Sequence, residues 1–64
     1  MNDDNNMITI KQHKNFSNWF QVFSFGKMVD EFTKRADAVE LAVSIAKNNE
    51  KTHINVLGRA MKVK

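Results

Sequence analysis

Few residues of this chain could carry out covalent chemistry, and their spacing does not favour it. The two histidines, His13 and His53, have no cysteine to complete a common zinc ligand set, and their spacing matches no metal-binding motif. Asp30 and Glu31 are adjacent carboxylates. On a strand, however, neighbouring side chains point to opposite faces, so this pair cannot serve one substrate as acid and base. We therefore expect no metal site and no carboxylate-based catalysis.

Nucleophiles and phosphate-binding loops are equally poorly represented. Ser17, Ser24 and Ser44 have no histidine in a recognisable arrangement for nucleophilic catalysis. Gly26 and Gly58 are the only glycines, so there is no glycine-rich loop to hold a phosphate. A chain of 64 residues also leaves little room for a deep pocket. The expected protein is not an enzyme, and it has no cofactor and no small-molecule substrate.

Basic residues form the second group that could build a functional surface. The formal net charge is +3, and because Asp3 and Asp4 lie near the N-terminus, the remainder is more basic than the total. Such a surplus can attract nucleic acid or an acidic protein. The candidate nucleic-acid contacts are Lys11, Lys14, Lys27, Arg59, Lys62 and Lys64. The simpler interpretation is a soluble surface with a lysine-rich C-terminal end.

One helix must position the rest of the chain, and its pattern runs from Thr33 to Asn49. Apolar residues recur there at the i, i+3, i+4, i+7 spacing of a helix face, with neither glycine nor proline inside. Thr33 is the expected N-cap, since its hydroxyl can accept from a first-turn N–H. A line of small residues, Ala38, Ala42 and Ala46, forms the middle of the apolar face. We expect this line to let the helix approach a sheet closely.

The apolar arc of this helix is wider than one packed face requires. Leu41 and Ile45 lie on one flank of the alanine line, and Val39 and Val43 lie on the other. Together they cover roughly 220° of the wheel, against roughly 100° or more for a helix packed on one side. The second flank must therefore contact either more of this chain or a second chain.

Alternating apolar and polar residues predict the strands around this helix. The expected strands are Met7–Gln12, Trp19–Phe25, Lys27–Phe32 and His53–Gly58, with 59–64 as either a short edge strand or a frayed tail. The order is strand, strand, strand, helix, strand. The expected fold class is α+β: a small antiparallel sheet of about four strands with one helix packed across it.

The second expected strand is unusually aromatic on both of its faces. Alternation places Phe20 and Val22 on one face and Trp19, Phe23 and Phe25 on the other. A single helix covers only one face of a sheet. Either sheet twist buries the remaining aromatic surface in the same core, or this surface is an interaction site.

The chain lacks the covalent supports that small domains usually have. It has no cysteine and therefore no disulfide, and a domain of this length buries only about 60% of its unfolded surface. Together with the wide helix arc, this favours a non-enzymatic interaction or regulatory module that forms a homodimer or binds another protein. The candidate interface residues are Val39, Val43, Trp19, Phe23 and Phe25. Nucleic acid, held by the basic residues, is the alternative partner.

Neither a membrane span nor a secretion signal is evident in the sequence. No apolar stretch approaches the roughly 20 residues that cross a bilayer, and the initial MNDDNN is acidic where a signal peptide is basic. We expect a cytoplasmic protein with no membrane association. Residues 1–6 are expected to be a flexible N-terminal tail, and residues 7–64 a single small α+β domain.

The segment from Trp19 to Arg59 resembles a family of very small bacterial and phage proteins of unknown function. The matching motifs are Trp19 with Val22, then Phe32-Thr33-Lys34, Asp37-Ala38, Ala46-Lys47, and the closing strand from Ile54 to Arg59. The chain departs from the family pattern by a wider spacing after the tryptophan, one extra residue after Lys34 and a shortened end. The resemblance implies a small sheet-plus-helix domain, and it adds no function.

Overall fold

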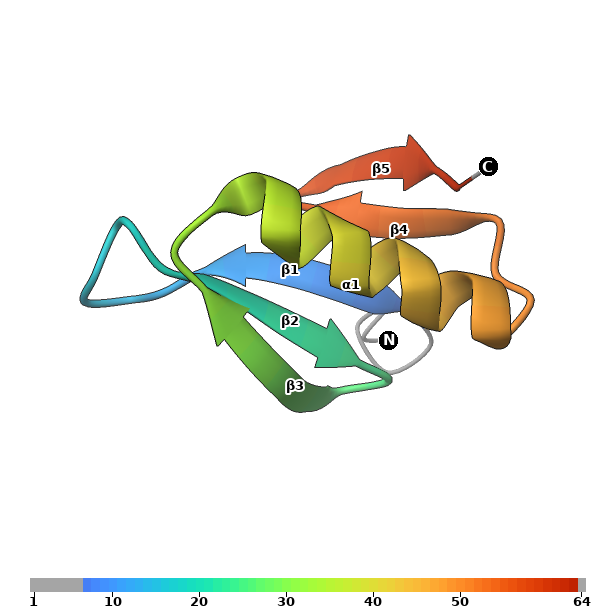
Figure 1. The fold of residues 1–64 in the computed structure, drawn as a ribbon, viewed down its shortest axis with the longest axis horizontal. Helices are drawn as coiled ribbons and strands as arrows, with labels where there is room; N and C mark the ends of the chain where they lie inside the picture. The colour runs from blue at the N-terminus through green and yellow to red at the C-terminus, as the bar shows by residue number, and fades with distance from the viewer. Residues whose placement is uncertain (1–6, 64) are drawn as a thin grey trace.

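The computed structural model shows one helix lying across one face of a five-stranded sheet (Figure 1). The structure describes residues 7–63, so the expected N-terminal tail, 1–6, and Lys64 lie outside the described residues. The elements in chain order are β1 (Ile8–Gln12), β2 (Phe20–Ser24), β3 (Lys27–Phe32), α1 (Arg35–Asn48), β4 (His53–Val56) and β5 (Arg59–Lys62). The predicted α+β class is confirmed, and the C-terminal segment does form a strand. Within the described range, no helix has the length and apolar character needed to cross a membrane.

The sheet is mixed, whereas the sequence analysis expected it to be antiparallel. Its strand order is β3-β2-β1-β4-β5, and the central strand β1 pairs antiparallel with β2 but parallel with β4. The cause is the helix that joins β3 to β4. Fourteen helical residues span about 21 Å, close to the length of a six-residue strand, so α1 returns the chain to the end where β3 began. As a result β4 runs in the same direction as β3 and β1.

The core lies between α1 and the face of the sheet that it covers. Ala38, Ala42 and Ala46 have no exposed surface, which confirms the predicted close approach of the helix to the sheet. The sheet residues buried against them are Ile8, Ile10, Val22, Ile54 and Val56. The smallest side chains of the helix therefore meet the branched side chains of the three central strands.

Both flanks of the helix find partners in this wide sheet. Leu41 and Ile45 on one flank, and Val39 and Val43 on the other, are half-buried and pack against the core. A five-stranded sheet extends beyond the helix on each side, so it can contact both flanks. The second apolar flank is thus partly, and not wholly, available to another molecule.

The helix begins later than the sequence suggests. Its N-cap position is Lys34, whose backbone is extended and whose side chain makes no capping hydrogen bond. Thr33 is therefore not the N-cap, because the chain is still extended one residue after it. Beyond the C-terminus, the left-handed residue is Glu50 (φ 58°) and not one of the two preceding asparagines.

Two hairpins close with the same kind of two-residue turn. Phe25 and Gly26 join β2 to β3, and Leu57 and Gly58 join β4 to β5, all four with positive φ. Two consecutive left-handed residues form a type I′ turn, whose twist matches that of the flanking strands. Asparagine, aspartate and glycine are the favoured residues there, so a large apolar side chain in the first position is unusual in both turns.

Candidate functional surfaces

The sheet has a second face, which no helix among residues 7–63 covers. Ile10 and Val22 point toward α1, and the strand registers then place their neighbours on the opposite, open face. The open-face residues are Thr9, Lys11, Gln21, Phe23, Met28, Glu31, His53, Asn55, Ala60 and Lys62. Most are polar, so this face has the composition of a surface with one aromatic ring near its centre.

One hollow on this face combines basic side chains with that ring. The Lys11 ammonium nitrogen lies 5.0 Å from the centre of the Phe23 ring, a cation–π arrangement. The hollow has a volume of about 500 Å³, and its lining residues are Lys11, Gln12, His13, Lys14, Asn15, Gln21 and Phe23. We call it the basic hollow.

The loop from β1 to β2 holds one wall of the basic hollow in place. The His13 ring nitrogen Nδ1 accepts hydrogen bonds from the backbone N–H groups of Asn15 (3.0 Å) and Phe16 (3.3 Å). The backbone of His13 also donates to the Trp19 carbonyl at 3.0 Å. These bonds fix Lys14 and its neighbours beside the end of β1, although the loop itself is exposed.

A second hollow lies where the two parallel strands β1 and β4 end. Its volume is about 380 Å³, and its lining residues are Thr9, Ile10, Lys11, Gln12, Asn55, Leu57 and Gly58. We call it the strand-end hollow. Thr9 is only 3% exposed, and its hydroxyl oxygen is buried without a hydrogen-bond partner. The Asn55 side-chain oxygen accepts from the Gly58 N–H at 2.9 Å, which fixes the orientation of that amide.

Sequence analysis did not single out Thr9, Asn55 or Leu57. In the sequence, Thr9 is the polar member of an alternating strand, a position that normally faces solvent. Its burial follows from its place in the central strand, between Phe23 of β2 and Asn55 of β4. No local signal in the sequence encodes those two neighbours.

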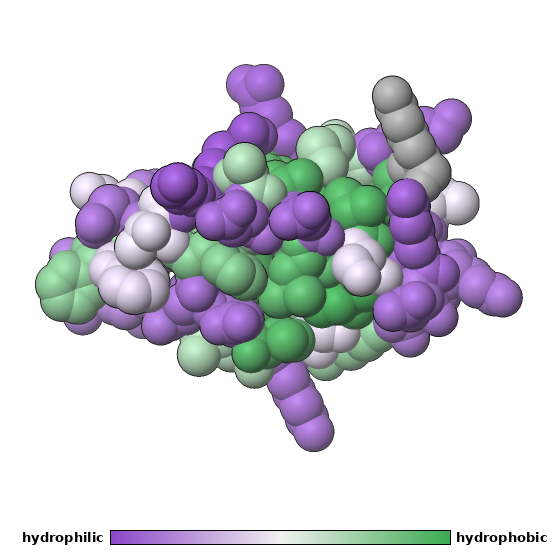
Figure 2. Space-filling model, in the orientation of Figure 1, coloured by the Kyte–Doolittle hydropathy of each residue, from purple (hydrophilic) through white to green (hydrophobic). Residues whose placement is uncertain are grey.

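The helix-bearing face carries an extensive apolar surface. Figure 2 shows hydrophobic side chains gathered over α1 and continuing toward β3. On the helix, Leu41 and Ile45 are half-buried on the flank toward β3 (Figure 1), and on β3, Phe32 is half-buried while Val29 is 50% exposed. Val39 and Val43, the predicted interface residues of the helix, lie on the other flank, toward β4 (Figure 1), so this surface does not include them. The surface therefore consists of Leu41, Ile45, Phe32 and Val29. We call these four residues the helix–β3 surface. Val29 is exposed at a β-bulge, where it is the extra residue between the partners of Val22 and Phe23.

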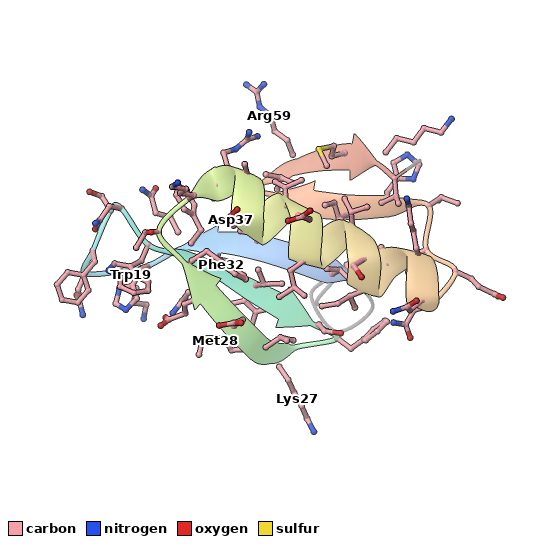
Figure 3. The ribbon with its side chains drawn as sticks, viewed as in Figure 1. Trp19, Lys27, Met28, Phe32, Asp37 and Arg59 are labelled. Carbon is pink, nitrogen blue, oxygen red and sulfur yellow. The ribbon has the colours of Figure 1, made fainter. Side chains whose placement is uncertain are left out.

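The predicted basic residues are dispersed over the molecule. Lys11 and Lys14 line the basic hollow together. Lys27 and Arg59 project from opposite borders of the sheet, as Figure 3 shows. Lys62 pairs with His53 at the far end of the open face. The structure thus brings two of the five described candidate nucleic-acid contacts into one site, and the sixth, Lys64, lies outside the described residues.

The three aromatic candidates do not form one patch either. Phe23 is half-buried on the open face, beneath the Lys11 ammonium. Trp19 precedes β2 at the loop end of the molecule (Figure 3), and Phe25 follows β2 in the hairpin turn. Because the length of β2 separates Trp19 from Phe25, a single small partner cannot contact all three rings.

Metal chemistry finds no support among the described residues, where no three histidine, aspartate or glutamate side chains gather into a potential ligand set. Comparison with protein-family models, curated proteins and solved structures finds no match to the chain. The function must therefore be argued from the surfaces themselves.

Proposed function

We propose that this protein is a non-enzymatic interaction module that acts as a homodimer joined through its helix–β3 surface. The observation that carries the proposal is the continuity of apolar surface from α1 to β3, with Val29 half exposed on β3 and Leu41 and Ile45 half-buried on the facing flank of α1 (Figure 1, Figure 2). Contiguous exposed apolar surface on a small soluble domain commonly marks an interaction site. A second copy would also add buried area to a domain whose own core is small.

The charges along β3 favour a two-fold contact between identical copies. The strand register places Lys27 and Asp30 on the helix-bearing face, and both are exposed. In a two-fold interface each surface meets its own copy in the opposite direction. Lys27 of one protomer can then face Asp30 of its partner, and this pairing occurs twice.

Direct strand-to-strand pairing across the β3 edge is the less favourable way to form that dimer. The bulge at Val29 interrupts the regular ladder of an edge strand, and Asp30 and Glu31 add charge there. Bulges and charges of this kind oppose the addition of another strand. We therefore place the contact on the face formed by α1 and β3, not on the strand edge.

The test is the oligomeric state of Leu41→Asp compared with Ser44→Asp. Both changes add one carboxylate to α1, but Leu41 lies on the apolar flank toward β3 (Figure 1) and Ser44 is exposed on the polar side. Sedimentation at low micromolar concentration should show a dimer for the wild type and for Ser44→Asp, and a monomer for Leu41→Asp. Val29→Asp provides a second variant at an already exposed position, so its folding should be preserved. A wild-type protein that sediments as a monomer under the same conditions would refute the proposal.

A second candidate function, binding of single-stranded nucleic acid, rests on the basic hollow. There Lys11 and Lys14 lie beside the Phe23 ring, and positive charge next to an aromatic ring is the usual arrangement for holding a nucleotide strand. Two phosphate contacts predict a shallow salt dependence, with log K falling by roughly 1.4 per tenfold increase in salt.

The corresponding experiment is a binding titration with a single-stranded RNA and DNA of random sequence at ~50 mM salt, where phosphate contacts are strongest. Lys14→Gln should weaken binding, whereas Lys47→Gln, an exposed lysine on α1 outside the hollow, should not. Equal losses in the two variants would indicate general charge attraction and would remove this candidate.

A further inference from the structure

The strand-end hollow contains a polar group whose environment the fold does not explain. The Thr9 hydroxyl has almost no exposed surface and no hydrogen-bond partner. Buried side-chain polar atoms in folded proteins nearly always have a partner, and an exception calls for a specific reason. A valine would fill the same volume in the strand without that cost. A ligand that supplies the missing hydrogen bond would explain why this position holds a threonine.

The wall of this hollow contains a second unusual choice of residue. Leu57 occupies the first position of its type I′ turn with φ 51°, and its side chain remains 41% exposed. A left-handed backbone is unfavourable for a branched apolar residue, and asparagine or aspartate suits this position better. Beside it, Gly58 faces open space, with no atom within 4 Å of where a Cβ would lie. An apolar side chain is therefore presented, at some strain, at the rim of an open hollow.

Three side chains around the hollow can offer donors to a ligand. The Asn55 oxygen is occupied by the Gly58 N–H, so the amide nitrogen is the group that Asn55 can offer to a ligand. Thr9 and Asn55 are register partners on adjacent strands, which places them about 5 Å apart on the open face. Lys11 also lines this hollow, and its ammonium, over the Phe23 ring, adds positive charge nearby. Such a set of donors matches a ligand group that only accepts hydrogen bonds and is negatively charged.

We propose that the strand-end hollow binds the carboxylate of a small amphipathic acid. The carboxylate oxygens accept from the Thr9 hydroxyl and the Asn55 amide, and the apolar part of the ligand lies against Leu57. The flexible Lys11 side chain, next along β1 on the same face, moves aside to open the way to the hydroxyl. The hollow, at about 380 Å³, is at the small end of the range for small-molecule sites. The carboxylate belongs either to a free acid or to the C-terminus of a peptide.

The experiment is an NMR titration of the ¹⁵N-labelled full chain with 4-methylpentanoate and with its uncharged amide. The acid should shift the backbone signals of Leu57 and Gly58 and the side-chain NH₂ of Asn55, and the amide of the same shape should not. A short peptide ending in leucine, with a free or an amidated C-terminus, forms the second arm. Binding of the free-ended peptide alone assigns the carboxylate to a peptide, and binding of the small acid as well assigns it to either source.

Two substitutions at one position make this test specific. Thr9→Val removes the hydroxyl and should weaken binding at least about tenfold, which corresponds to 1.4 kcal/mol, whereas Thr9→Ser keeps the hydroxyl and should retain binding. The inference is overturned if no carboxylate shifts these signals at about 10 mM, if Thr9→Val binds as tightly as the wild type, or if the shifts spread evenly over all lysines. None of these outcomes depends on whether the protein is a dimer, since the hollow and the helix–β3 surface are on opposite faces.

Discussion

Replacing Thr9 by valine should stabilise the free protein, which is unusual for a change in the central strand of a sheet. The hydroxyl that is removed is buried and has no partner, and such a group costs about 1–3 kcal/mol. Valine keeps the β-branched shape and creates no cavity, so no packing is lost. Valine also suits a strand at least as well as threonine does. The expected gain is therefore about 1–3 kcal/mol, or a melting temperature higher by about 4–8 °C for each kcal/mol.

Urea unfolding followed by circular dichroism measures this gain, with both proteins at one concentration because self-association would also raise stability. The dependence on urea should be unchanged, since the two chains bury the same surface. Thr52→Val is the matched control: Thr52 is exposed and its hydroxyl lies 2.9 Å from a His53 ring nitrogen, so valine there should bring no gain. If Thr9→Val is less stable than the wild type, the hydroxyl has a partner in solution. The argument for a ligand in the strand-end hollow would then fail.

Two further substitutions test the packing and the turns. Leu41→Ala and Ile45→Ala should each lower the free energy of unfolding by about 2 kcal/mol, the lower end of the range for such truncations, because both side chains are half-buried against the core. A loss below about 0.5 kcal/mol, typical of surface changes, would mean that this flank does not support the fold. Leu57→Asn should raise stability by about 1–2 kcal/mol, because asparagine accepts a left-handed backbone. The same urea experiment measures it, and an unchanged midpoint would show that Leu57 carries no strain.

The helix and the faces of the strands are the parts that sequence reasoning predicts well, because periodicity encodes them directly. The alanine line at Ala38, Ala42 and Ala46 is fully buried, and the alternation in β2 correctly separates Val22 from Phe23. Such patterns record which side of an element is buried, whatever its neighbours are. The first residue of the helix is harder to predict from the sequence. Thr33 is suited to capping, but it does not cap the helix because the next residue, Lys34, remains extended.

The parallel pairing of β1 with β4 could not be predicted in the same way. It joins Thr9 to Asn55, residues far apart in the sequence, and neither strand contains a local signal for its partner. The distinction between an antiparallel and a mixed sheet depends on where the helix returns the chain. Both hollows depend on this pairing or on the loop at the same end, so the candidate ligand site was not visible in the sequence.

A comparison of the two hairpin turns separates structural from functional explanations of their apolar residues. Phe25 and Leu57 have the same left-handed backbone in the same kind of turn. The ring of Phe25 has a partner, since the Lys51 ammonium nitrogen lies 5.5 Å from its centre. Leu57, by contrast, is not among the hydrophobic residues that pack against the core within residues 7–63.

The position of the second turn then favours a functional explanation for Leu57. The parallel strands β1 and β4 end at the same border of the sheet. After β1 the chain turns toward β2, and after β4 it turns toward β5. Divergence of this kind opens a crevice at the ends of the strands, which is where open sheets commonly bind ligands. Leu57 forms the rim of that crevice, and Thr9 lies in its lining. The strained leucine and the unpartnered hydroxyl are thus two independent costs at one place, and binding of a ligand there would account for both.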